Sequence, residues 1–249
     1  MTVWQAILVG LIQGLTEFLP VSSSGHILLI ERIMGIKGEL SFALILHVAT
    51  LFAVVFAMRK EVLDFVRSPK KWGYVIVATL CSLLVVFALS GLLKSALSGK
   101  YLAPSFLVTA ALLLISGLVK PKKTAITYFD AAIIGCVQGL AVLPGLSRSG
   151  STVSTAMMLG NERAQSVSLS FLLSIPIIIG STAIDLITNG IGTIRPLPLV
   201  CGFLAAFISG TVAVKLMLRL SAKAWDWFVV YLTALSVFLI ANDLFFNLF

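Results

Sequence analysis

The sequence predicts an all-α integral membrane protein with six transmembrane helices and two re-entrant helical hairpins, arranged as an inverted-topology repeat. Three observations support this class. Of the 249 residues, 59% are hydrophobic and only 11% are charged, and the mean hydropathy is +1.09, whereas a soluble domain carries about a quarter charged residues. Several apolar runs reach the roughly 20 residues that cross a bilayer. One polar motif also occurs twice, each time inside an apolar region.

Six apolar runs are long enough to span the membrane. They contain no Lys or Arg except Lys215, which lies near the end of a run, where its side chain can reach the surface. The amino-terminal segment has neither the basic leader nor the cleavage site of a signal peptide, so no part is expected to be removed. The expected spans are residues 41–58, 73–93, 103–119, 164–187, 197–218 and 227–246.

Two further apolar regions, 2–35 and 127–160, are interrupted in the middle by Pro, Ser and Gly. Each half is too short to span, and non-helical backbone at membrane depth persists only where protein buries it or where it lines a cavity. We therefore expect two re-entrant hairpins. Aligned at an offset of 125 residues, 13–25 and 138–150 are identical at six of thirteen positions.

Three expected spans follow each motif. Because three is odd, the second hairpin must enter from the opposite membrane face, which is typical of an inverted repeat whose site lies near the midplane. The chain is expected to form one membrane domain, 1–249, with repeats of about 1–120 and 125–249.

Placing the 59–72 loop in the cytoplasm puts twelve basic residues on that side and five on the other, as the positive-inside rule requires. The first hairpin then opens outward. Membrane orientation also explains the net charge of +8, so nucleic acid is not an expected partner.

The two motifs differ in their charged residues. Glu17 follows Gln13 by four residues, which places both on one helix face. An ionised side chain at this depth costs roughly 3 kcal/mol and usually has a partner and a function. Arg148, which replaces Ser23 in the second motif, is the expected counter-charge, and its guanidinium suits phosphate oxygens. This divergence predicts one asymmetric site.

The serines and glycines of both motifs precede new half-helices, as helix caps do. Two helix amino termini aimed at one point would attract an anion. We therefore expect substrate contacts from Gln13, Ser22, Ser24, Gly25, Ser147, Ser149, Gly150 and Thr152.

Two histidines have different surroundings in the sequence. His26 directly follows the Ser-Ser-Ser-Gly turn, within plausible reach of Ser23 and Glu17, and Ser, His and a carboxylate together suggest an activated nucleophile with its base. The spacing does not establish such a triad. His47, in the run ALILHVAT, has no polar company and is expected to face the core. The three cysteines, Cys81, Cys136 and Cys201, show neither disulfide nor zinc spacing.

The motifs QGLTEFLPVSSSGH and PGLSRSGST resemble the two signatures of the undecaprenyl-diphosphate phosphatase (bacitracin-resistance protein) family. The resemblance covers the whole chain. It implies a membrane enzyme that hydrolyses undecaprenyl diphosphate to the monophosphate, recycles the carrier for peptidoglycan synthesis and cell shape, and confers bacitracin resistance. It further implies Glu17, Ser23 and His26 as the catalytic group, with Ser147, Arg148 and Thr152 on the phosphates.

The resemblance also implies a divalent cation, Mg²⁺ or Ca²⁺. Glu17 is the one deep carboxylate that could touch such an ion, which would be held mostly by the substrate's phosphates. The expected partners are the lipid substrate and the membrane, with a homodimer left open. The expected location is the bacterial plasma membrane, with the site open to the outer face. The nucleophile stays undecided between Ser23, His26 and water. A lipid transporter is the main alternative, because it shares the repeat architecture, and an ion channel is a distant third.

Overall fold

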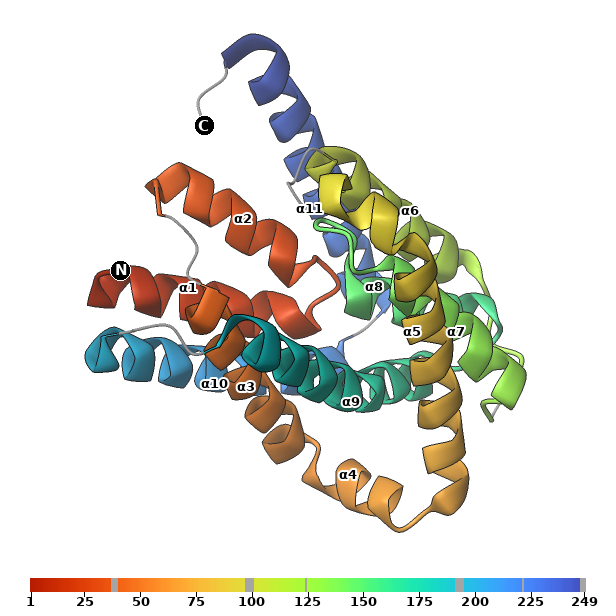
Figure 1. Cartoon of the computed structure of the whole chain (residues 1–249). Coiled ribbons are helices and arrows are strands. Elements are labelled where there is room, and N and C mark those ends of the chain that lie inside the picture. The colour runs from red at the N-terminus through yellow and green to blue at the C-terminus, as the bar shows by residue number, and fades with distance from the viewer. Residues whose placement is uncertain (37–39, 97–100, 124, 191–194, 221, 247–249) are drawn as a thin grey trace.

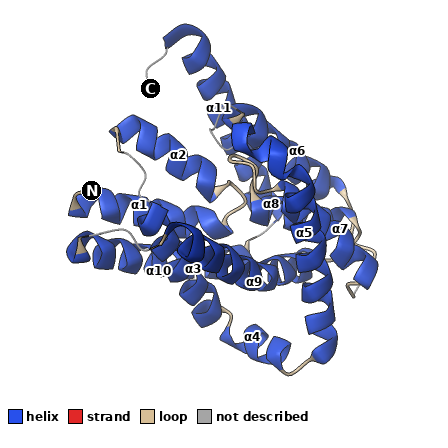
Figure 2. Ribbon diagram, viewed as in Figure 1, coloured by secondary structure: helices blue, strands red, loops and turns tan. Residues whose placement is uncertain are grey.

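The computed structural model is a bundle of helices, and it describes every residue except 37–39, 97–100, 124, 191–194, 221 and 247–249. No strand occurs among the described residues (Figure 2). In chain order the helices are α1 Val3–Phe18, α2 Ser23–Met34, α3 Leu40–Ala57, α4 Arg59–Val66, α5 Pro69–Ala96, α6 Leu102–Leu118, α7 Tyr128–Leu140, α8 Arg148–Met158, α9 Arg163–Asn189, α10 Pro196–Arg219 and α11 Ala222–Ala241, followed by a π-helical turn at Asn242–Phe246.

Four helices, α5, α9, α10 and α11, are long and apolar enough to cross a membrane. A fifth candidate is α3 together with α4, although the two are bent by 85° at their junction. The expected span 103–119 forms α6, which is shorter at 17 residues. The all-helical membrane class predicted from composition is therefore confirmed, with four to five candidate spans by length and composition.

Both motifs lie at helix breaks. The chain leaves α1 at Phe18 and begins α2 at Ser23, and it leaves α7 at Leu140 and begins α8 at Arg148. In Figure 1, α1 and α2 run beside each other on the left, α7 lies on the right, and α8 lies between them near the middle of the view. Half-length helices interrupted at these positions agree with the interruptions read in the sequence.

Glycine residues allow the first half-helix of each motif, α1 or α7, to pack closely on a long helix from the other half of the chain. Gly14 on α1 lies so close to α10 that an added Cβ would sit 2.7 Å from the Gly210 nitrogen. Gly139, the equivalent residue on α7, would place a Cβ 2.7 Å from the Ser82 carbonyl oxygen of α5. Small residues at such crossings let helix backbones approach within the membrane. Because α10 follows the second motif and α5 follows the first, each half of the chain holds the other's first half-helix.

The two second half-helices are packed differently. Helix α8 is enclosed by α6, α7 and α9, and nearly all of its residues are buried. Helix α2 packs mainly on α1, and only three of its residues are buried. The largest apolar cluster, which includes Phe18, Phe106, Phe171 and Trp225, fills the space around α8. The motif at α8 is therefore enclosed by protein, while most residues of α2 are half-buried or exposed.

Candidate active site

The two motif turns touch each other directly. The Gly145 backbone N–H donates to Ser22 Oγ at 3.1 Å, and Ser149 Oγ donates to the Leu19 carbonyl oxygen at 2.9 Å. Ser22 itself has φ of 71°, the only positive φ at a non-glycine residue among those described. Such backbone strain is uncommon and clusters at functional sites. The expected meeting of residues 13–26 with 138–150 is thus present in the structure.

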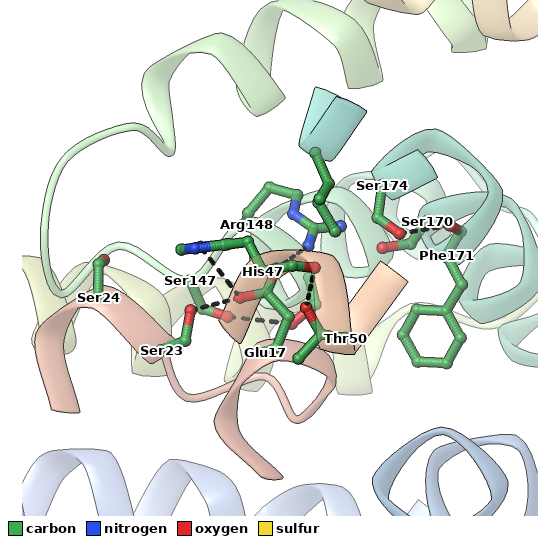
Figure 3. A network of polar contacts seen from close by, with 12 residues as sticks. Glu17, Ser23, Ser24, His47, Thr50, Ser147, Arg148, Ser170, Phe171 and Ser174 are labelled. Atoms are coloured by element: carbon green, nitrogen blue, oxygen red, sulfur yellow. Dashed lines mark hydrogen bonds and ion pairs between the residues drawn. The ribbon is translucent and has the colours of Figure 1, made fainter. Parts of the chain in front are cut away.

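A single carboxylate, that of Glu17, lies where the turns meet (Figure 3). Its side chain is only 6% exposed. The Arg148 guanidinium donates to Oε1 through Nη2, Ser23 Oγ donates to Oε2 at 2.7 Å, and Gln13 Nε2 donates to Oε2 at 3.0 Å. The predicted pairing of Glu17 with Arg148 is therefore observed, and Gln13, predicted to share a helix face with Glu17, donates to the same carboxylate.

Ser23 and Arg148 occupy equivalent positions of the two motifs, and each is the first residue of its helix. Ser23 donates to Oε2 of Glu17 and Arg148 donates to Oε1. The positive amino-terminal ends of α2 and α8 therefore both lie beside the same carboxylate. Burying an ionised carboxylate requires such compensation. The Glu17 carboxylate consequently lies between the two helix amino termini, at the position where the substrate anion was expected to bind.

Arg148 retains a free donor. Its side chain is 14% exposed, and the buried Nη1 atom has no hydrogen-bond partner among the described residues. Because guanidinium binds phosphate oxygens through two parallel N–H groups, this nitrogen is available to an anion entering beside Glu17. Arg148 can therefore hold Glu17 and begin to hold a phosphate.

Most serine hydroxyls of the two motifs stabilise the turns and the first residues of α2 and α8. Ser22 and Ser147 cap α2 and α8 by accepting from the N–H groups of Gly25 and Gly150. Ser24 Oγ lies 3.3 Å from Ser22 Oγ, and Ser149 Oγ, besides donating to Leu19, lies 3.2 Å from Ser147 Oγ.

Thr152 is placed away from the expected phosphate position. Its hydroxyl donates to the Arg148 carbonyl oxygen at 2.9 Å and lies 2.6 Å from Ser170 Oγ on α9. It is 1% exposed. Thr152 was expected to contact the substrate, but its hydrogen bonds instead fix the Arg148 end of α8 against α9.

His26 does not contact Ser23 Oγ or Glu17, the two residues with which the resemblance grouped it as catalytic. Its Nδ1 lies 2.8 Å from the Ser22 carbonyl oxygen and its Nε2 lies 2.6 Å from the Tyr231 hydroxyl on α11. Because a carbonyl oxygen can only accept, Nδ1 carries a hydrogen, and in the neutral ring Nε2 accepts from the Tyr231 hydroxyl. Both ring nitrogens are thus engaged away from Glu17, and Phe106 packs edge-on against the ring. The Ser23–His26–Glu17 triad is not assembled in this structure.

His47 is the histidine beside Glu17, contrary to the expectation that it faces the core. Its Nε2 lies 3.9 Å from Glu17 Oε2, and its side chain is 37% exposed (Figure 3). Thr50 donates to its backbone carbonyl oxygen at 2.8 Å. The sequence held no signal for this contact, because α3 comes from outside both motifs and the local pattern is uniformly apolar.

The described residues offer no cation site built from side chains. No group of three or more His, Cys, Asp or Glu occurs among them. Both Glu17 oxygens already accept hydrogen bonds from Arg148, Ser23 and Gln13, and a guanidinium beside the carboxylate opposes a second cation. Glu17 thus belongs to no such group of side chains among the described residues, and its role as a metal ligand stays a prediction.

A cavity of about 470 Å³ lies elsewhere, between the start of α5 and the start of α9, and it is lined largely by apolar side chains such as Phe65, Val75 and Leu169. None of its lining residues belongs to either motif. This cavity is therefore separate from the site around Glu17.

A helical membrane bundle with a buried Arg–Glu pair and a serine at two converging helix ends defines a class of anion-handling membrane protein. Comparison with known proteins makes this class specific, because residues 6–238 match the model of the family described as bacitracin resistance protein BacA. The chain belongs to this family.

Curated relatives are named undecaprenyl-diphosphatase. The chain is 37% identical to that of Carboxydothermus hydrogenoformans, over 95% of this chain and 96% of the relative. It is 36% identical to that of Parabacteroides distasonis, over 98% and 99%, and 38% identical to that of Bacteroides fragilis strain YCH46, over 94% and 96%.

Proposed function

We propose that this protein is an undecaprenyl-diphosphate phosphatase, which hydrolyses the lipid diphosphate to undecaprenyl phosphate and inorganic phosphate. The reaction recycles the lipid carrier for peptidoglycan synthesis, and removal of the diphosphate underlies bacitracin resistance. Family membership over residues 6–238 supports the activity. The observation that carries the assignment to a site is the buried Nη1 of Arg148, which lies without a partner among the described residues beside the Glu17–Ser23 pair.

The terminal phosphate is proposed to bind at Arg148. In phosphoryl transfer the negative charge spreads over the equatorial oxygens, so positioned donors and an arginine supply most of the catalysis. The amino terminus of α8, capped by Ser147, adds its dipole at the same point. Arg148 is therefore expected to contribute to the transition state more than to ground-state affinity.

The attacking oxygen is proposed to be Ser23 Oγ or a water in its place. Ser23 Oγ already donates to Glu17 Oε2 at 2.7 Å, so the carboxylate can accept the proton as the oxygen attacks phosphorus. The P–O bond of the anhydride breaks, and undecaprenyl phosphate leaves as an anion. If Ser23 attacks, a water subsequently cleaves the phosphoserine and releases phosphate.

His26 is proposed to act through the turn. Its bond to the Ser22 carbonyl oxygen fixes the strained residue directly before Ser23, and Tyr231 holds the ring in place. A cation, where one is required, is proposed to arrive on the substrate's own phosphates, since two adjacent phosphate groups supply the hard oxygen ligands that Mg²⁺ prefers.

The membrane arrangement is proposed to be six spans with two re-entrant hairpins, α1–α2 and α7–α8, in an inverted repeat. The packing of α1 on α10 and of α7 on α5 supports this arrangement. The sparse packing of α2 supports a site open to the outer face of the bacterial plasma membrane, with the prenyl tail leaving laterally.

The test is release of inorganic phosphate from a prenyl diphosphate by the purified protein in detergent, with the Arg148→Ala variant as control. Hydrolysis needs no sealed compartment, whereas lipid transport does, so activity in detergent separates the two functions. Absence of phosphate release from well-folded wild-type protein, across a range of cations, would overturn the proposal.

A further inference from the structure

Glu17 has a second neighbour that the proposed reaction has not used. His47 on α3 points its Nε2 toward Glu17 Oε2 at 3.9 Å. Its Nδ1 lies 2.9 Å from the Ala43 carbonyl oxygen, and since a carbonyl can only accept, Nδ1 carries a hydrogen. The ring can therefore change protonation at Nε2 alone, the atom that faces the carboxylate.

Substrate binding creates a conflict at Arg148. In the free protein Arg148 Nη2 is committed to Glu17 Oε1, while Nη1 has no partner among the described residues. A phosphate bound by the guanidinium fork needs two parallel N–H groups, so it competes with Glu17. Displacement would leave Glu17, 6% exposed, as a buried carboxylate without a cation, which is strongly unfavourable.

We propose that His47 is the second partner of Glu17. When a phosphate binds the Arg148 guanidinium, Glu17 loses its ion pair with Arg148 and forms an ion pair with protonated His47. The inference rests on the proposed phosphate site and makes His47 a positioning residue that acts through Glu17. The proton comes from solvent, which the 37% exposure of the His47 side chain permits. Binding of a diphosphate is then expected to strengthen as the pH falls, because only the protonated imidazole carries a positive charge.

Other charged groups near α3 do not substitute for His47. Glu17 is the only charged residue of α1, and His47 is the only titratable residue of α3. Lys215 on α10 lies over the Phe56 ring, 5.9 Å from its centroid, nine residues or about 13 Å along α3. Arg163 on α9 stacks on Trp225. The remaining charged residues of the helices packed on α3 are Arg219, Asp185, Arg59, Lys60, Glu61 and Asp64, and no ion pair joins any of them to His47 within the described chain.

The experiment measures binding of farnesyl methylenediphosphonate, a non-hydrolysable diphosphate, by calorimetry at pH 6 and pH 8. Wild type, His47→Gln, Glu17→Gln and the double variant are compared in the same detergent. Glutamine keeps the approximate size of the imidazole but cannot carry its proton. His26→Gln is the matched control at the other histidine.

We expect His47→Gln to bind the analogue about tenfold more weakly than wild type at pH 6, with little difference at pH 8. In the Glu17→Gln background the same change should have no effect, because no carboxylate needs a new cation. His26→Gln should leave the pH-dependent difference in place. Ionisation of the analogue itself is common to all of these proteins and cancels.

Equal binding by wild type and His47→Gln at pH 6 would overturn the inference, as would a pH effect on binding that is as large in Glu17→Gln as in wild type. The comparison of wild type with Glu17→Gln needs no change at His47, so it decides the matter even where His47→Gln does not fold. Phosphate release is assayed separately: protein that binds the analogue with this pattern yet hydrolyses nothing would refute the phosphatase and leave the role of His47 standing.

Discussion

Replacing Arg148 by alanine tests the chemistry and the packing of the site together. The guanidinium is the cation that compensates Glu17, and its Nη1, without a partner among the described residues, is the donor proposed for the phosphate. The variant should therefore lose both activity and stability, and the two losses should respond differently to a second change at Glu17.

The sizes of the two losses follow from the surroundings. Removing one positioned donor from a transition state costs about 10²–10³-fold, and an arginine on a transferred phosphoryl group is worth about 10³–10⁵-fold, so we expect kcat to fall by about 10³ or more. An unpaired buried carboxylate destabilises by about 3–5 kcal/mol. We expect the lower end, because Ser23 and Gln13 still donate to Glu17.

The assay pairs phosphate release in detergent with the midpoint of thermal unfolding for Arg148→Ala, Glu17→Gln and the double variant. The neutral amide that Glu17→Gln introduces removes the unpaired charge, so the double variant should regain most of the lost stability while its kcat stays at the Arg148→Ala level. Near-wild-type turnover in Arg148→Ala would refute the reasoning. Recovery of activity together with stability would show that the arginine has only a structural role.

Four further outcomes are expected. Glu17→Gln should lower kcat at least about 100-fold, whereas Glu162→Gln, at an exposed helix end, should not; equal losses would discredit the site. Tyr231→Phe removes the 2.6 Å contact to His26 and should cost about 1 kcal/mol of stability with kcat within severalfold; a hundredfold loss would place this pair in the chemistry. If the cation binds together with the substrate, EDTA should abolish hydrolysis, and calorimetry should detect no Mg²⁺ binding to the substrate-free protein. Stoichiometric Mg²⁺ binding to that protein would instead show a site held by the protein. Gly14→Ala, which drives a Cβ to 2.7 Å from the Gly210 nitrogen, should destabilise by about 1–3 kcal/mol, while Gly91→Ala, with nothing within 4 Å, should have little effect.

The sequence predicted those features that depend on local pattern. Hydropathy located every long helix, and the interruptions of 2–35 and 127–160 located both helix breaks. The charge difference between the motifs predicted that Glu17 and Arg148 would meet, because a lone acid and a lone base in apolar surroundings each require a partner. The hydroxyl-rich caps at Ser22 and Ser147 were also read correctly from their positions before each helix.

What the sequence could not provide were contacts between elements that share no motif. His26 was assigned to Glu17 because the two are close in the chain, but the strained turn at Ser22 directs its ring to Tyr231, 205 residues away. His47 was assigned to the core because its neighbours are apolar, but helix packing places it on the face of α3 that meets α1. Side-chain direction after a turn is a tertiary property, and spacing does not determine it.

The asymmetry of the site explains why one half of the repeat is buried more tightly than the other. In the proposed exchange Arg148 keeps a fixed position while its partner changes, and α8 packs against three helices and is bound to α9 through Thr152 and Ser170. In the proposed reaction Ser23 instead meets a bulky lipid, and it begins α2, which packs mainly on α1. A symmetric repeat with arginine in both turns would place two guanidinium groups at one carboxylate, and one with serine in both would leave Glu17 without a cation. Divergence at this pair of equivalent positions, and at Glu17 and Val142, therefore fits one asymmetric site, the one proposed for the diphosphate.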